Sequence, residues 1–149
     1  MNIIYSDQSA YGNAHPSMFL AGPTPRDEST PSWRPEALRI LKELNYKGTV
    51  FVPEYSIRQE QVDYLKQVEW EDAALNSALY QVFWVPRNLI TLPAFTTNIE
   101  FGRFAHLPSC LYGRPDDSEK NQYLDWYYTK YNNHPIYNSL TDLLKRATL

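Results

Sequence analysis

The sequence has few of the features that mark secreted, membrane or nucleic-acid-binding proteins. Its single cysteine, Cys110, excludes an internal disulfide framework and is compatible with a reducing compartment. The longest basic run is the pair Lys145-Arg146 and the formal net charge is -3, so we expect no binding to duplex nucleic acid. No apolar run approaches the ~20 residues that span a bilayer, and the N-terminus does not resemble a signal peptide. We therefore expect a cytoplasmic protein that binds no membrane.

Several common catalytic motifs are also missing. The sequence has neither the dinucleotide-binding GxGxxG nor the phosphate-binding GxxxxGK[ST], and it has no GxSxG nucleophile motif. His15, His106 and His134 show no metal-ligand spacing with one another or with Cys110. We therefore expect no metal site. A Cys110 nucleophile with a histidine base stays an alternative, although Cys110 lies in an apolar run, where a thiol is usually inert.

The composition is that of one ordinary globular domain, which we place at residues 1–149. Hydrophobic residues make up 43% of the chain and charged residues 21%. Aromatic residues are numerous, with 12 Tyr, 4 Trp and 6 Phe. Such side chains suit pockets for flat heterocycles and protein interfaces, but they are equally common in a core.

Short apolar runs alternate with amphipathic stretches. We predict strands at 2–5, 18–22, 49–53, 81–86, 109–113 and 134–137, and helices at 33–45, 61–79, 98–106, 119–131 and 139–147. The apolar side of the second helix should be formed by Leu65, Val68, Ala74, Leu75 and Ala78. This alternation indicates an α/β fold with a central parallel sheet of about five strands and helices on both faces. In such sheets ligands bind at the carboxyl ends of the strands.

The segments that follow the strands contain candidate ligand-binding residues. Gly22 either lets the backbone approach a ligand or forms a simple tight turn. Four arginines near strand ends are either phosphate or carboxylate ligands or solvated charges; they are Arg26, Arg34, Arg87 and Arg114. Glu54 ends the third of these strands.

Two further glutamates lie on predicted helices. Glu71 should lie near the buried side of its helix, where an unpaired charge is unfavourable and therefore suggests a functional role. Thr97-x-x-Glu100 fits the pattern of a capping box, which would place Glu100 at position N3 of a helix that begins near Asn98. Alternatively, Glu100 is a nucleophile that the positive end of the helix keeps ionised. Two carboxylates from neighbouring strand–helix units are the smallest set of catalytic groups that a retaining glycosyl reaction needs.

Four stretches in this order, "MFLAGPTPR", "FVPE", "WEDAALNSALYQVFWVPR" and "LPAFTTNIEFG", resemble the nucleoside 2-deoxyribosyltransferase family. The resemblance covers about residues 17–115. It implies a flavodoxin-like three-layer sandwich and cleavage of the N-glycosidic bond of a nucleoside or nucleotide, without a metal or organic cofactor. It also implies a homodimer or larger homo-oligomer, because relatives complete their active sites with C-terminal residues of a neighbouring subunit.

Matched residue by residue, the nucleophile of the family falls on Glu100. The carboxylate that assists departure of the base falls on Glu71, where Asp is more usual. The resemblance and the strand-end rule together give eight substrate-binding candidates: Phe19, Gly22, Pro23, Glu54, Arg87, Ala94, Thr97 and Asn98.

This chain departs from the family pattern at three places. Phe19 replaces a tyrosine of many relatives, and Ala78-Leu79 replaces a common Ala-Asp pair. Ala94 stands where transferases of the family have Asp and nucleotide hydrolases have Ser to hold the 5′ group of the substrate. The resemblance therefore leaves the identity of the 5′ group open. Arg87 or Arg26 is an alternative ligand for a 5′ phosphate. The possible functions are transfer of 2-deoxyribose, hydrolysis of a deoxynucleotide, hydrolysis of a ribonucleotide, and nucleotide binding without catalysis.

The segment 123–131 has aromatic residues at helical spacing: Tyr123, Trp126, Tyr127 and Tyr131. This is more aromatic surface than a terminal helix of a monomer usually needs. The rings either form an interface between subunits or cover the edge of the sheet.

Overall fold

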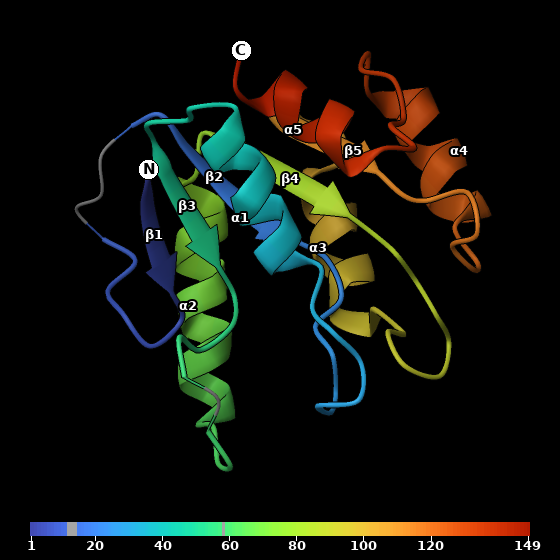
Figure 1. The fold of residues 1–149 in the computed structure, drawn as a ribbon. Coiled ribbons are helices and arrows are strands. Elements are labelled where there is room, and N and C mark those ends of the chain that lie inside the picture. Colours follow the sequence, from blue (N-terminus) through green and yellow to red (C-terminus); the bar gives the residue numbers. More distant parts are fainter. Residues whose placement is uncertain (12–14, 58) are drawn as a thin grey trace.

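The computed structural model describes residues 1–11, 15–57 and 59–149, and within these residues one five-stranded parallel sheet forms the centre of the molecule (Figure 1). Its strands are β1 (Asn2–Tyr5), β2 (Ser17–Ala21), β3 (Thr49–Val52), β4 (Tyr80–Trp84) and β5 (Cys110–Gly113). Their order across the sheet is β1-β3-β2-β4-β5, and every neighbouring pair is parallel. From β2 the chain moves to β3 on one side and then crosses to β4 and β5 on the other, which creates a switch point at the carboxyl ends of β2 and β4.

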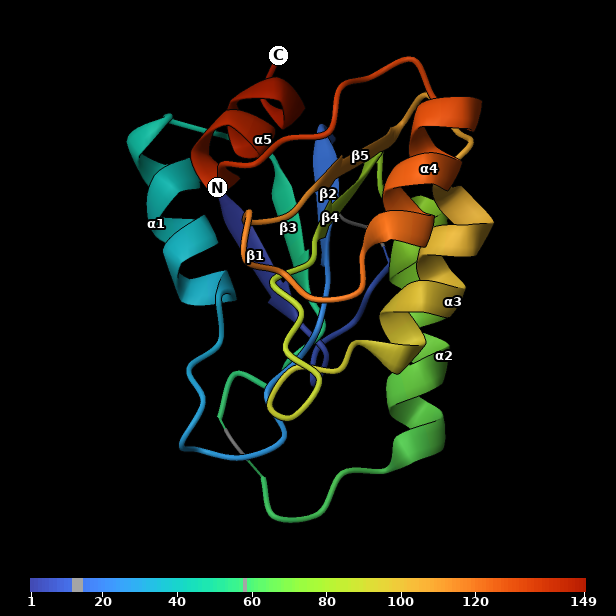
Figure 2. The ribbon, with the colours of Figure 1, turned by 90° about the vertical axis from the view of Figure 1, so that its right-hand side faces the viewer.

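The helices are α1 (Arg34–Glu43), α2 (Tyr64–Ser77), α3 (Phe95–Phe104), α4 (Gln122–Tyr131) and α5 (Leu140–Ala147). Figure 2 shows α1 and α5 on one face of the sheet and α2, α3 and α4 on the other. The predicted flavodoxin-like three-layer α/β sandwich is thus confirmed. In the part of the chain that the structure describes, no helix combines the length and apolar character of a membrane span.

The sheet divides the core into two apolar clusters. Along β2 successive side chains point to opposite faces, so Met18 and Leu20 pack with α1 and α5, while Phe19 and Ala21 pack with α2, α3 and α4. All five residues of β2 are buried. The near-continuous apolar runs of the sequence follow from this burial on both faces.

The predicted strand at 134–137 is wrong. Tyr137 forms only an isolated parallel bridge to Gly113. Its N–H donates to the carbonyl of Tyr112 at 3.0 Å, and its carbonyl accepts from the N–H of Arg114 at 2.8 Å. Pro135, two residues earlier, has no N–H to donate to a ladder, so the pairing does not extend into a strand.

The apolar face predicted for α2 is correct only in its C-terminal half. Ala74, Leu75 and Ala78 are buried, whereas Leu65 is 64% and Val68 39% exposed. The helix extends past the ends of the neighbouring strands (Figure 1), so its first turns have no sheet to cover. Helical periodicity cannot show where along a helix the sheet ends.

Candidate active site

A cavity of about 260 Å³ lies at the carboxyl ends of β2, β3 and β4, between the loops that follow them and helices α2 and α3. This is the position expected for a ligand in a doubly wound sheet. Eight of the candidate residues line it: Gly22, Pro23, Arg26, Arg34, Glu71, Ala94, Thr97 and Glu100. The fold thus brings together side chains that the sequence separates by up to 78 positions.

Glu100 does not belong to a capping box. Helix α3 begins at Phe95 after Ala94, which adopts a left-handed conformation with φ of 60° and makes no side-chain cap hydrogen bond. Thr97 therefore lies inside the first turn, and Glu100 is the sixth residue of the helix. The prediction of a helix beginning near Asn98 with Glu100 at N3 is wrong.

The early start of α3 follows from a buried arginine. The guanidinium of Arg87 donates to the carbonyl of Pro93 at 2.8 Å and to Oδ1 of Asn98 at 2.6 Å. It also donates to Oδ1 of Asn121 at 3.2 Å. These bonds fix the turn before the helix. Neither cavity is lined by Arg87 or Asn98. These two residues position the loop before α3, and they do not reach the space where a ligand would bind.

The carboxyl groups of Glu71 and Glu100 line the same cavity and lie close enough to shift each other's pKa. Burial, reinforced by the negative charge of Glu71, raises the pKa of Glu100 to about 8. Burial also raises the pKa of Glu71, and the hydrogen bond from Gln67 and the charge of Arg34 oppose that increase. Glu100 lies beyond the first turn of α3, where the helix dipole mainly acts, so the helix end does little to offset the effect of burial on its pKa. At neutral pH the two carboxyls together hold a proton.

Arg34 supplies a fixed positive charge beside this pair. Its side chain is 1% exposed and donates to the carboxylate of Glu54 at 2.9 Å. It also donates to the carbonyls of Leu20 at 3.0 Å and Gly22 at 2.7 Å. Among the four arginines considered from the sequence, Arg34 therefore binds a carboxylate of the protein itself. Arg114 likewise pairs with Asp125, at 2.7 Å.

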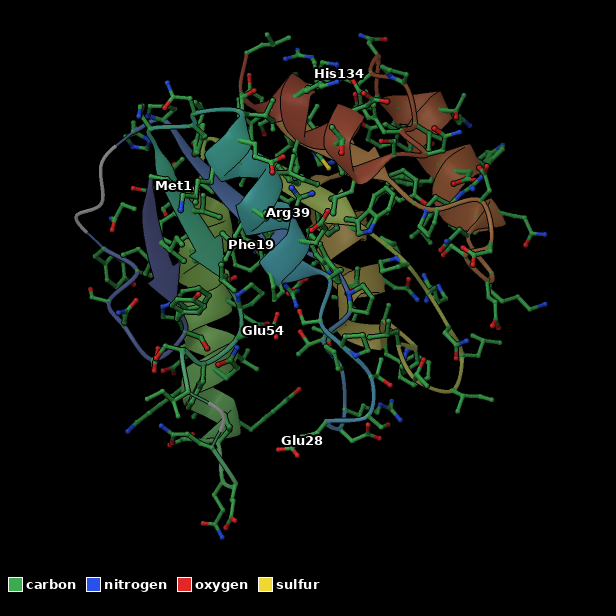
Figure 3. All side chains as sticks on the ribbon, in the orientation of Figure 1. Met1, Phe19, Glu28, Arg39, Glu54 and His134 are labelled. Atoms are coloured by element: carbon green, nitrogen blue, oxygen red, sulfur yellow. The ribbon has the colours of Figure 1, made fainter. Side chains whose placement is uncertain are left out.

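A second cavity, of about 660 Å³, adjoins the first. The two share Thr24, Arg26, Pro53, Gln67 and Glu71 as lining residues. Glu54 and Glu28 line the second cavity, and Figure 3 shows both at the end of the molecule toward which β1 and β3 point. Glu71 thus lies at the boundary between the cavities, whereas Glu100 lines the smaller one.

Gln67 contacts the carboxyl pair and was not a candidate from the sequence. It lies one helical turn before Glu71 on α2, and its Nε2 donates to Oε1 of Glu71 at 2.8 Å. The i, i+4 spacing from a candidate catalytic glutamate is a signal that would have found it.

Gly22 and Phe19 have packing roles. Gly22 has φ of 151°, and a Cβ there would lie 2.1 Å from the carbonyl oxygen of Trp84. Glycine is therefore required where the end of β2 passes β4. Phe19 is 1% exposed and packs against Trp70, with ring centroids 6.1 Å apart, so its side chain belongs to the core beneath the site.

Within residues 1–11, 15–57 and 59–149, no group of three or more His, Cys, Asp or Glu side chains is arranged to hold a metal ion. Cys110 is fully buried, and burial raises the pKa of its thiol well above the ordinary value.

None of the curated proteins matches the chain. A family model described as "Nucleoside 2-deoxyribosyltransferase like" matches residues 15–117, which is more than half of the chain. The matched region contains β2 to β5, α1 to α3 and both glutamates of the cavity. The resemblance seen in the sequence is confirmed, and the chain belongs to the nucleoside 2-deoxyribosyltransferase-like family.

Proposed function

We propose that the protein cleaves the N-glycosidic bond of a nucleoside or nucleotide through a covalent glycosyl ester on Glu100. One observation carries the proposal beyond family membership: Glu71 lies between two adjoining cavities, while Glu100 lines the smaller of them. A sugar in the smaller cavity and a base in the larger one would place the scissile bond beside both carboxyls. The larger volume falls within the range of ~300–1,000 Å³ typical of ligand sites.

In the first step an oxygen of Glu100 attacks C1′ and the bond from C1′ to the base nitrogen breaks. The electron pair of that bond goes to the base, and the proton held by the pair passes from Glu71 to the base nitrogen. The close interaction between Glu71 and Glu100 allows one proton to serve both groups. A carboxylate nucleophile and a second carboxyl that donates a proton, both beside the scissile bond, are what retaining glycosyl chemistry requires.

In the second step a water or another base attacks C1′ and Glu100 leaves as a carboxylate. Glu71, now ionised, accepts the proton of the incoming nucleophile. The fixed charge of Arg34 attracts both carboxylates and limits their mutual repulsion. Hydrolysis and transfer therefore use the same residues, and the second nucleophile decides between them.

The 5′ group of the substrate would face the first turn of α3. Ala94, Phe95, Thr96 and Thr97 line this part of the smaller cavity. Arg26 lines it too, and its guanidinium carbon lies 5.9 Å from the centre of the Phe95 ring. Because Arg26 lines the cavity and Arg87 is enclosed, we infer that Arg26 would contact a 5′ phosphate.

The test is incubation of the purified protein with a panel of deoxynucleosides, deoxynucleotides and ribonucleotides, followed by chromatography of the free bases. We expect release of base from at least one 2′-deoxy substrate. Adding a second base distinguishes transfer, which forms a new nucleoside, from hydrolysis. Binding of nucleotides without release of any base would instead support a non-catalytic binding module, and selective release from ribonucleotides would support the ribonucleotide glycohydrolase.

A further inference from the structure

Gln67 is held in one orientation at the wall between the two cavities. Its Nε2 donates to Oε1 of Glu71 at 2.8 Å and to the carbonyl of Pro53, at the end of β3, at 3.3 Å. Both partners accept hydrogen bonds. Reversing the amide would therefore place its oxygen against two other oxygens. The donor groups of Gln67 must face Glu71 and Pro53.

This orientation leaves a buried acceptor unsatisfied. Oε1 of Gln67 has no hydrogen-bond partner among the described residues. A buried acceptor without a donor destabilises a fold, and such groups are rare where a side chain serves stability alone. The contact with Glu71 is thus kept at a cost to the fold.

A donor hydrogen bond to a carboxyl group favours its ionised form. Gln67 contacts Glu71 and not Glu100, so it favours the arrangement in which Glu71 is charged and Glu100 holds the proton. Other charged groups act on the pair as well. Arg34, itself paired with Glu54, acts on both carboxyls, and Arg103 acts on Glu100.

We propose that Gln67 is a positioning residue, which fixes the carboxyl group of Glu71 between the cavities and keeps the shared proton on Glu100 in the empty site. The consequence for catalysis rests on the proposed function. Before Glu100 attacks C1′, its proton must move to Glu71, from which it reaches the departing base. No other group is oxidised, reduced or transferred in that step. Gln67 thereby keeps the nucleophile protonated until a substrate is bound.

The test is a carboxyl-carbon NMR titration of protein labelled with ¹³C at the glutamate side chains, which needs no substrate. The signals are assigned with Glu71→Gln and Glu100→Gln. Gln67→Met removes the donor and keeps a good helix former. We expect the Glu71 midpoint to rise by roughly one pH unit and the Glu100 midpoint to fall. Gln67→Lys, which restores a donor and adds a charge, should lower the Glu71 midpoint.

Gln59→Met is the matched control, because Gln59 is exposed and lines the larger cavity without contacting the pair. It should leave both midpoints unchanged. Equal midpoints in Gln67→Met and the parent protein would overturn the proposal. So would a parent protein in which Glu100 loses its proton before Glu71. Thermal unfolding of each variant checks that the fold is retained.

Activity is a separate readout. In an active protein Gln67→Met should move the acidic limb of the pH profile to higher pH and change kcat more than KM. If the parent releases no base but the titration shifts as expected, the proposed function fails and the role of Gln67 stands. If the parent releases base but the titration does not change in Gln67→Met, the proposed function stands and the role of Gln67 fails.

Discussion

The carboxyl groups of Glu71 and Glu100 line the same cavity and shift each other's pKa although they lie on different helices, α2 and α3. The neighbouring residue Asp72 forms an ion pair with Arg103 at 3.0 Å, which joins the same two helices at the surface. Exposed pairs of this kind contribute little stability. The position of the carboxyl pair instead follows from the packing of both helices on one face of the sheet.

Replacing Glu100 with Gln should abolish release of base, by at least about 10³-fold, because an amide does not form the glycosyl ester. The protein should stay folded, since Glu100 caps no helix. Glu69→Gln, an exposed change on α2, is the control. Acid quenching during turnover, followed by mass spectrometry, should find a sugar on the peptide containing Thr97 to Arg103. A Glu100→Gln protein that releases base at the parent rate would end the hypothesis of a Glu100 nucleophile.

The same substitution should change how stability depends on pH. The pKa of Glu100 is raised to about 8 in the folded protein, above its ordinary value of 4.5. Its contribution to stability is therefore present below pH 4.5 and is lost as the pH rises through 8. Each unit of pKa difference corresponds to about 1.4 kcal/mol. Urea unfolding at pH 5, 7 and 9 should show the parent losing stability relative to Glu100→Gln; parallel curves would contradict the raised pKa.

Replacing Glu71 with Gln should lower turnover by about 10²–10⁴-fold, the usual range for a general acid. The loss should be smaller for a substrate whose base leaves readily without protonation, because that base needs less help from a proton donor. Comparing a poor and a good leaving group in the parent and the variant measures this difference. An equal loss for both bases would assign Glu71 to binding rather than to proton transfer.

Gly22→Ala should destabilise the protein by roughly 1–3 kcal/mol, because the new Cβ would meet the carbonyl of Trp84 and the backbone is in a region that favours glycine. Gly102→Ala is the matched control. Gly102 lies inside α3 with open space around the new Cβ, so alanine should stabilise the protein by about 0.5–1 kcal/mol. Chemical unfolding measures the change in the free energy of unfolding for both variants. Similar changes in the two would show that crowding at Gly22 does not destabilise the alanine variant.

We predict a homodimer or larger assembly through α4. Tyr123 is 72% and Trp126 53% exposed, while Leu124 and Tyr128 of the same helix are buried. The exposed rings therefore do not serve to cover the sheet. Trp126→Glu should shift the mass measured by light scattering at micromolar concentration toward the monomer. A parent protein that is already monomeric would exclude this role for the exposed rings.

Much of the fold could be predicted because the signals for a parallel sheet are local. The strand at 2–5 was placed at its observed bounds, and the other four strands were placed to within two residues. The errors lie where a residue far away in the sequence decides. Arg87 starts α3 at Phe95, and the end of the sheet leaves Leu65 exposed. Neither cause is visible in a window of neighbouring residues.

The sequence by itself determined the fold class and the family and named two glutamates as candidates, since hydrophobic periodicity and ordered motifs need no three-dimensional information. Only the tertiary structure decided which candidates meet in the cavity. It brought Gln67 into contact with Glu71, placed the charge of Arg34 near both carboxyls, and left Phe19 and Arg87 outside the cavity lining. The physical reason is that the protonation of a buried carboxyl depends on every charge and donor around it. These neighbours come from separate strand–helix units, which only the packed sheet brings together.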